Sequence, residues 1–236
     1  MAGCIALAFL EISNSSIFSL SEKEYAFIGL EDTLKAFKVT NCVYASNWEW
    51  THLENLNKLQ VLEISSSNIL EIEDDFLKIS KCPLENINFR DNDIENIVYK
   101  AFSTFKDLTR LNLDKNSLKS VVRSMLPIPA KKLYSLGLSN NKIRELPHNM
   151  FSEMPSLRYL YLEGNELLLL EAQTFTPIWK KLKIAFFTGC PIRCDCSISW
   201  IATMKQKVRL VHGTCSTPAK LKDRKITELT TDDFVC

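Results

Sequence analysis

The stretch that decides the fold is "LTRLNLDKNSL", residues 108 to 118, with apolar residues at offsets 0, 3, 5 and 10 and Asn at offset 8. Copies of this template, some of them weaker, start at residues 7, 34, 59, 84, 108, 133, 157 and 182. The steps between these starts are 24 to 27 residues. A period this steady predicts a solenoid, in which each repeat is stable only when it is stacked on its neighbours.

Each offset of the template has a physical reason. Apolar residues at offsets 3 and 5 predict a short strand with one buried face, and stacked copies pair these strands in parallel. At offset 8 the chain leaves the strand, and an Asn there can donate to and accept from backbone groups that would cost about 1–3 kcal/mol each if left unpaired. We call this position the ladder, and its occupants are Ser15, Cys42, Ser67, Asn92, Asn116, Asn141, Asn165 and Cys190.

The two ladder cysteines are best interpreted as buried, reduced structural residues. The limb that returns from each strand also repeats its apolar residues, so we expect these side chains to form the core rather than a cofactor site. The matching positions are Ile94, Ile97, Phe102 and Phe105, then Ile143, Leu146, Phe151 and Met154, then Leu167, Leu170, Phe175 and Ile178.

This pattern resembles the leucine-rich repeat, and the 24-residue form with its Phe position is similar to extracellular members of that family. The resemblance covers residues 7 to about 193. It implies an α/β-class solenoid, a curved parallel β-sheet horseshoe, with eight repeats in residues 1–189 and a separate cap in residues 190–236.

Residues 190–236 are rich in cysteine. Cys-x-Cys at 194 to 196, Trp200, Cys-x-x-Pro at 215 to 218 and a final Phe-x-Cys follow one another in this order. Four cysteines allow three disulfide pairings, and spacing alone does not choose among them. The segment resembles the C-terminal flanking cap of extracellular leucine-rich repeat proteins, which implies the pairs Cys194–Cys215 and Cys196–Cys236.

The cap has two further features. A zinc site formed with His212 is disfavoured, because Cys-x-Cys is tight for two tetrahedral ligands. Trp200, Ile201 and Met204 stand at helical spacing, and we expect them to cover the open end of the last repeat.

The beginning of the chain, "GCIALAFLEISNSS" at residues 3 to 16, has two interpretations. It can be a signal peptide, or it can be the first repeat, starting at Leu7. No Lys or Arg precedes the apolar run, Glu11 interrupts it and no small-residue cleavage site follows, which favours the repeat. A disulfide-bonded chain needs export, so we expect a missing N-terminal segment with a leader and cap. Asn14 is the acceptor of the N-x-S/T sequon and a candidate for glycosylation.

Composition and motifs argue against several functions. The formal net charge of +1 gives no reason to expect nucleic-acid binding, and no apolar run approaches the length of a membrane span. No H-E-x-x-H, G-x-S-x-G, G-x-G-x-x-G or P-loop string occurs, and the three histidines do not converge with a nucleophile. The acidic run at residues 71 to 75 is interpreted as a solvated face. We therefore predict no catalytic residues, no metal and no cofactor.

Residues at offsets 2 and 4 are expected on the concave face of the sheet, and aromatic and Arg side chains collect there in the second half of the chain. Such side chains are typical of protein-binding hot spots. The alternative is that the cap folds over some of these rings. The predicted concave patch is Arg110, Tyr134, Arg158, Tyr159, Tyr161 and Phe186.

Charge is segregated along the chain. Residues 180 to 225 carry 11 Lys and Arg against two Asp, a net charge of +9, which leaves −8 for the remainder. A basic cap can hold sulfated glycans or anionic lipid headgroups through salt-sensitive contacts. The alternative is an ordinary solvated surface.

These observations predict an extracellular, non-catalytic protein-binding module, of the kind used in adhesion, receptor or matrix recognition. A second interpretation comes from "FIGLEDTLKAFKVTN" (27 to 41) and "WEWTHLENLNKLQVLEIS" (48 to 65). These stretches resemble arthropod proteins described as the non-catalytic subunit of the oplophorus-luciferin monooxygenase. That resemblance implies an accessory subunit of a secreted monooxygenase.

Overall fold

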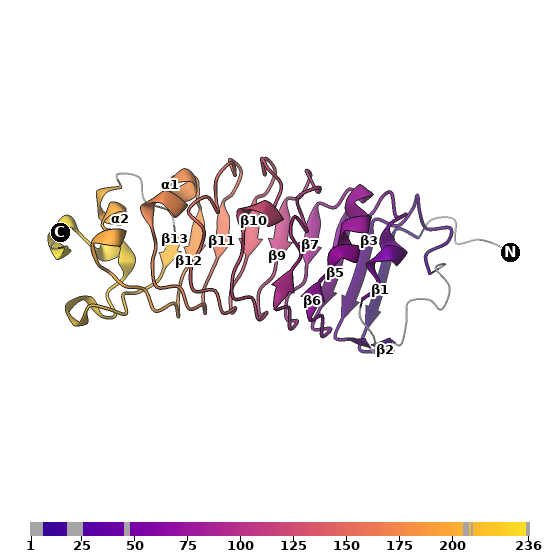
Figure 1. Cartoon of the computed structure of the whole chain (residues 1–236), viewed down its shortest axis with the longest axis horizontal. Helices are drawn as coiled ribbons and strands as arrows, with labels where there is room; N and C mark the ends of the chain where they lie inside the picture. The colour runs from indigo at the N-terminus through magenta and orange to yellow at the C-terminus, as the bar shows by residue number, and fades with distance from the viewer. Residues whose placement is uncertain (1–6, 18–25, 45–47, 205–207, 209, 235–236) are drawn as a thin grey trace. The chain divides into compact units, whose positions relative to one another are not determined.

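The computed structural model describes residues 7–17, 26–44, 48–204, 208 and 210–234 (Figure 1). The chain divides into two compact units. The first unit is Met1–Ser117 with Ser124–Pro127, and the second is Leu118–Arg123 with Ile128–Cys236. Each unit carries part of the repeat array and is described separately.

The first unit contains five parallel strands of the main sheet: β1 (Phe9–Ser13), β3 (Ala36–Thr40), β5 (Val61–Ser65), β7 (Asn86–Asn88) and β9 (Arg110–Asn112), each paired with the next in this order. Two small parallel pairs flank it, β2 (Ser16–Ile17) with β4 (Val43–Tyr44) and β6 (Glu71–Ile72) with β8 (Asn96–Ile97). The return limbs include the 3-10 helices η1 (Trp50–Leu53) and η2 (Asp74–Lys81), while η3 (Arg123–Met125) has residues of both units.

The second unit contains four parallel strands, β10 (Ser135–Gly137), β11 (Tyr159–Tyr161), β12 (Ile184–Phe186) and β13 (Leu210–His212), again paired in this order. Its helices are α1 (Ala172–Trp179) and α2 (Trp200–Thr203), which Figure 1 labels in orange. Short 3-10 turns complete the C-terminal segment: η4 (Cys196–Ile198), η5 (Ala219–Leu221), η6 (Ile226–Glu228) and η7 (Thr231–Asp233). The parallel sheet with few helices is the leucine-rich repeat fold predicted from the sequence.

The strand count corrects one expectation, because the sequence predicted eight strands and placed residues 210–212 in the cap. These residues form β13, which pairs with β12 in register: Leu210 lies beside Ile184 and His212 beside Phe186. The copy escaped the template because Gly213 stands where offset 5 requires an apolar residue. A Cβ on Gly213 would lie 3.1 Å from Phe187 Cβ, so the neighbouring ring takes the space that a side chain would fill.

The core of each unit is built from the template positions. Leu62, Leu111, Leu136 and Leu160, all at offset 3, are at most 1% exposed. Phenylalanine rings of successive repeats pack against one another in edge-to-face or tilted contacts, most of them on return limbs and Phe187 at offset 5 of the template. The ring centroids are 5.6 Å apart for Phe76–Phe102 in the first unit, and in the second 5.4 Å for Phe151–Phe175 and 5.7 Å for Phe175–Phe187.

The ladder residues tie each repeat to the one before it. The side-chain oxygen of Asn92 accepts from the backbone N–H of Ser67 at 2.9 Å, while its Nδ2 donates to the carbonyls of Ile64 and Phe89 at 2.8 and 3.0 Å. In the second unit, Asn165 accepts from Ile143 and donates to two leucine carbonyls in the same way. Both asparagines are buried. One amide therefore satisfies backbone groups on two neighbouring repeats.

Toward the ends of the ladder, thiols take the place of the amides. Cys42 and Cys190 are buried free thiols, and Cys190 Sγ donates to the Leu162 carbonyl at 3.2 Å. Burial raises the pKa of the Cys190 thiol and raises that of Cys82, a buried thiol on a return limb, to about 11. A thiol that stays protonated is a poor nucleophile, so the raised pKa values of Cys82 and Cys190 favour a structural role for these two cysteines.

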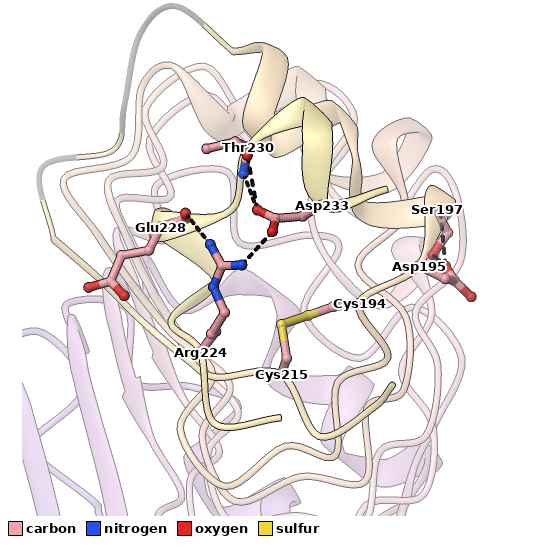
Figure 2. The surroundings of a disulfide bond; sticks show 8 residues. All are labelled: Cys194, Asp195, Ser197, Cys215, Arg224, Glu228, Thr230 and Asp233. Carbon is pink, nitrogen blue, oxygen red and sulfur yellow. Dashed lines mark hydrogen bonds and ion pairs between the residues drawn. A yellow bond between two sulfur atoms is a disulfide. The ribbon is translucent and has the colours of Figure 1, made fainter. Parts of the chain in front are cut away.

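The C-terminal segment is closed by a disulfide between Cys194 and Cys215 (Figure 2). Cys196 is also disulfide-bonded. Its predicted partner, Cys236, lies outside the described residues, so that pair stays a prediction. On α2, Trp200 donates from Nε1 to the Leu170 carbonyl at 2.8 Å, and its ring lies 4.9 Å from Trp179. Trp200 therefore packs on the return limb of the repeat that starts at residue 157, and the prediction that this helix covers the open end of the last repeat stays a prediction.

Candidate functional site

Alternate residues of each strand point away from the core, and the surface that they form is here called the open face. On β11 these residues are Tyr159 and Tyr161, which lie on either side of the buried Leu160. In register they stand beside Ile184 and Phe186 of β12. The strand alternation therefore places large side chains of neighbouring repeats next to one another on one surface.

The rings of the open face contact one another. Tyr134 and Tyr159 have centroids 5.0 Å apart, Tyr161 and Phe186 5.7 Å, and Phe186 and His212 5.0 Å, each in an edge-to-face arrangement. We call these five residues the ring patch. The four Tyr and Phe side chains are half-buried and His212 is exposed, so part of every ring still faces solvent. Leu210, beside them on β13, is 42% exposed.

The two tyrosines at the start of the patch are linked through their hydroxyl groups, which lie 3.5 Å apart. This contact, together with minor desolvation, raises the pKa of Tyr159, while nearby Lys183 acts in the opposite direction. The Tyr159 hydroxyl is therefore neutral at physiological pH and remains a hydrogen-bonding group. A partner would meet apolar ring edges with polar tips.

The two arginines of the predicted patch have different positions. Arg158 precedes β11, and its Nη1 donates to the carbonyls of Pro155 and Leu157 at 3.0 and 2.9 Å, so part of its guanidinium holds the entry turn. Arg110 is exposed on β9, in the first unit. The six predicted residues thus divide between the units, with five in the second.

His212 and Leu210 are the candidate site residues that sequence reasoning missed. The signal was present in "VRLVHG", residues 208 to 213, which repeats the strand template 26 residues after the previous start. The departure that concealed it is Gly213 at offset 5, since Ser216 at offset 8 matches the serines at other ladder positions. The sequence therefore supported a cap at this point as readily as another repeat.

The open face of the first unit carries the apolar Phe9 and Val61 together with polar residues, and several of its polar side chains pair with one another. Lys38 Nζ lies 3.5 Å from Glu63 Oε2, and Asn88 donates to Glu63 Oε1 at 3.0 Å. Ser65 adds a longer contact to the same oxygen at 3.4 Å. These residues satisfy one another across three neighbouring strands.

The basic residues of the cap are partly neutralised by local ion pairs. Arg193 pairs with Asp195. Arg224 pairs with Asp233 and also donates to the Glu228 carbonyl (Figure 2). A hydrogen bond from Ser197 holds the pKa of Asp195 below its usual range, and the Thr230 backbone and Arg224 do the same for Asp233. The count of +9 for residues 180 to 225 already includes Asp195, and Asp233, which lies outside that range, lowers the net charge of this part of the surface further.

Other predicted residues lie apart from the ring patch. His52 is bonded to Glu49 at 2.7 Å, and His148 lies 2.7 Å from Glu171. The acidic run at 71 to 75 is not wholly a solvated face, because Asp75 Oδ2 accepts from the Trp50 backbone N–H at 3.2 Å and burial raises the pKa of Asp75.

Asn14 is exposed in the first unit, and its side-chain oxygen accepts from Asn41 at 2.7 Å. Its glycosylation stays a prediction. Within the described ranges, no three His, Cys, Asp or Glu side chains come together in a way that could hold a metal ion. No helix in the part of the chain that the structure describes is long and apolar enough to cross a membrane.

Comparisons with known proteins agree with this fold. A family model described as Leucine rich repeat matches residues 131–178. Toll-like receptor 8 of Homo sapiens is 31% identical over 125 residues, which is 50% of this chain and 12% of the receptor. Trophoblast glycoprotein of Mus musculus is 30% identical over 138 residues, or 56% of this chain and 32% of that protein. The chain thus matches a third or less of these relatives.

A solved structure is similar over nearly the whole chain. It belongs to an octameric complex of Latrophilin 3, Unc5D and FLRT2, the last represented by its leucine-rich repeats. The similarity has a TM-score of 0.74 at 21% sequence identity and covers 95% of this chain and 75% of that chain. The chain therefore has the leucine-rich repeat fold.

Proposed function

We propose that this chain is an extracellular, non-catalytic recognition module that binds a protein through the ring patch of its second unit. The observation that carries the proposal is two groups of partly exposed rings in edge-to-face contact on neighbouring repeats, Tyr134 with Tyr159 and Phe186 with Tyr161 and His212. Rings of this kind bury a large area at little entropic cost and dominate many interfaces. The resemblance to leucine-rich repeat proteins predicts that this open face is concave.

Two further findings support an extracellular role. The disulfide between Cys194 and Cys215 fits an oxidising compartment. The similar proteins include a Toll-like receptor and a glycoprotein, and the similar structure comes from a complex of several proteins. In this proposal residues 190–236 act as the C-terminal flanking cap, with Cys196–Cys236 as the second disulfide.

The proposal predicts that Tyr159→Ala with Tyr161→Ala abolishes partner binding. Two anchoring rings contribute about 2 kcal/mol each at a hot spot, so affinity should fall at least about a hundredfold. The test is a pull-down from native extracellular fluid, with the wild-type chain and the double variant as baits and bound proteins identified by mass spectrometry. The affinity of the identified protein is then measured directly by surface plasmon resonance.

The control is Val61→Ala with Asn86→Ala, both at offset 2 in the first unit, the offset that Tyr159 holds in the second, and binding should be unchanged. Circular dichroism melts establish that both variants fold. If the wild-type chain and the tyrosine variant retained the same proteins in equal amounts, the ring patch would not be the binding site. The accessory-subunit interpretation stays a prediction from sequence, and retention of an oxygenase by the wild-type bait alone would support it.

A further inference from the structure

The segments that enter β10, β11 and β12 concentrate positive charge beside the ring patch. Backbone hydrogen bonds hold these segments side by side: Arg158 N–H donates to the Tyr134 carbonyl at 2.9 Å, and Lys183 N–H donates to the Arg158 carbonyl at 2.8 Å. These segments carry six cations and one carboxylate, Glu153. The six cations are here called the basic edge: Lys131, Lys132, Arg158, Lys180, Lys181 and Lys183.

The residues that follow β10 and β11 carry charges of both signs. Lys142 and Arg144 follow β10, and Glu163 and Glu166 follow β11. Arg144 pairs with Glu166 at 2.7 Å. Parallel strands bring all their beginnings to one edge and all their ends to the other, so the net positive charge of these segments lies at the edge where the strands begin.

The positive charge of the basic edge is available to a partner. Lys131, Lys180, Lys181 and Lys183 are exposed, and none of them is in an ion pair with another described residue. The single carboxylate, Glu153, interacts with the buried Arg123. In the cap, by contrast, local carboxylates neutralise several of the basic residues. Four exposed lysines of the second unit therefore leave positive charge accessible beside the rings.

From this arrangement we infer that the protein bound at the ring patch presents an acidic segment, with its carboxylates over the basic edge and its apolar side chains on the rings. This inference rests on the proposed function. Complementary charge speeds association and fixes the orientation in which a partner docks. A uniformly anionic glycan would match the lysines but leave the rings without a counterpart, so a mixed acidic and apolar protein segment fits better.

The test uses the full chain and a random peptide library displayed on phage as the probe. Peptides that bind the wild-type chain are selected and sequenced, and their affinities are measured at low and at physiological salt. We expect enriched peptides to combine acidic with aromatic or aliphatic residues. Lys131→Glu with Lys181→Glu should weaken their binding roughly tenfold or more, with a smaller salt dependence.

The matched control is Lys58→Glu with Lys106→Glu, because these lysines hold the equivalent positions before the strands of the first unit. It changes the net charge of the chain by the same amount and should leave binding unchanged. If both variants lost peptide affinity equally, the effect would depend only on the net charge of the chain, and the inference would be overturned.

The ring variant separates this inference from the proposed function. Peptides that lose binding with Tyr159→Ala and Tyr161→Ala but tolerate the lysine reversal would overturn the acidic partner and leave the ring patch standing. If the ring variant keeps every selected peptide, both are overturned. Heparin oligosaccharides that bind the basic edge while the selected peptides carry no acidic residues would identify a glycan instead and overturn the inference.

Discussion

The two units share the leucine core and the asparagine ladder, and they differ in the residues of their open faces. At offset 4 of the template the first unit has Lys38, Glu63 and Asn88, which bond to one another, and the second unit has Tyr161 and Phe186, which leave ring surface in contact with solvent. Behind both surfaces lie the same leucine core and the same asparagine ladder. A repeat fold thus keeps stability and recognition on separate positions, and the open face can change without changing the core.

The largest expected effect tests whether the asparagine ladder stabilises both units to the same extent. Asn92→Ala in the first unit and Asn165→Ala in the second should each lower the free energy of unfolding by about 3 kcal/mol, because each leaves several buried backbone groups unpaired. Urea denaturation followed by circular dichroism measures the change. Asn86→Ala, on the open face, is the control and should cost less than about 0.5 kcal/mol. A decrease in the free energy of unfolding of less than about 1 kcal/mol at either ladder position would show that the ladder does not stabilise both units alike.

A smaller effect tests the difference between the open faces. Glu63→Ala removes the acceptor of Lys38 and Asn88 and should lower stability by about 1 kcal/mol without changing partner binding. Tyr161→Ala, at the same offset, should weaken partner binding strongly. Thermal melts and binding of the partner are measured for both variants. The distinction between the faces would fail if Glu63→Ala weakened binding as much as Tyr161→Ala.

The smallest effect concerns Asp75, which caps η1 in the first unit. Its pKa is raised, chiefly by burial, so its contribution to stability is complete below its ordinary pKa near 3.8 and is lost as the pH rises through the raised value. Asp75→Asn keeps an acceptor for the Trp50 N–H and carries no charge. At pH 7 the variant should be more stable by roughly a few tenths of a kcal/mol, since solvent screens this partly exposed group. The two melting curves should converge in acid, and a gap that persists there would contradict the assignment.

Much of the structure was predictable because it repeats. A steady period specifies parallel strands, a leucine core and the ladder without knowledge of distant contacts, and the structure places Asn92 and Asn165 as the template requires. The ninth strand was not predictable in this way. Gly213 breaks the template, and its meaning depends on Phe187, which lies in the neighbouring repeat.

The amino-acid sequence by itself determined the fold, because offsets 0, 3, 5 and 8 impose the same local geometry in every repeat. It also indicated that Tyr159, Tyr161 and Phe186 share one surface. Only the tertiary structure decided which charged side chains remain outside ion pairs and accessible to a partner. Arg224 forms an ion pair with Asp233 within the cap, whereas Lys181 and Lys183 are exposed beside the rings. Ion pairing depends on which side chains meet in space, and a count along the chain does not contain that information.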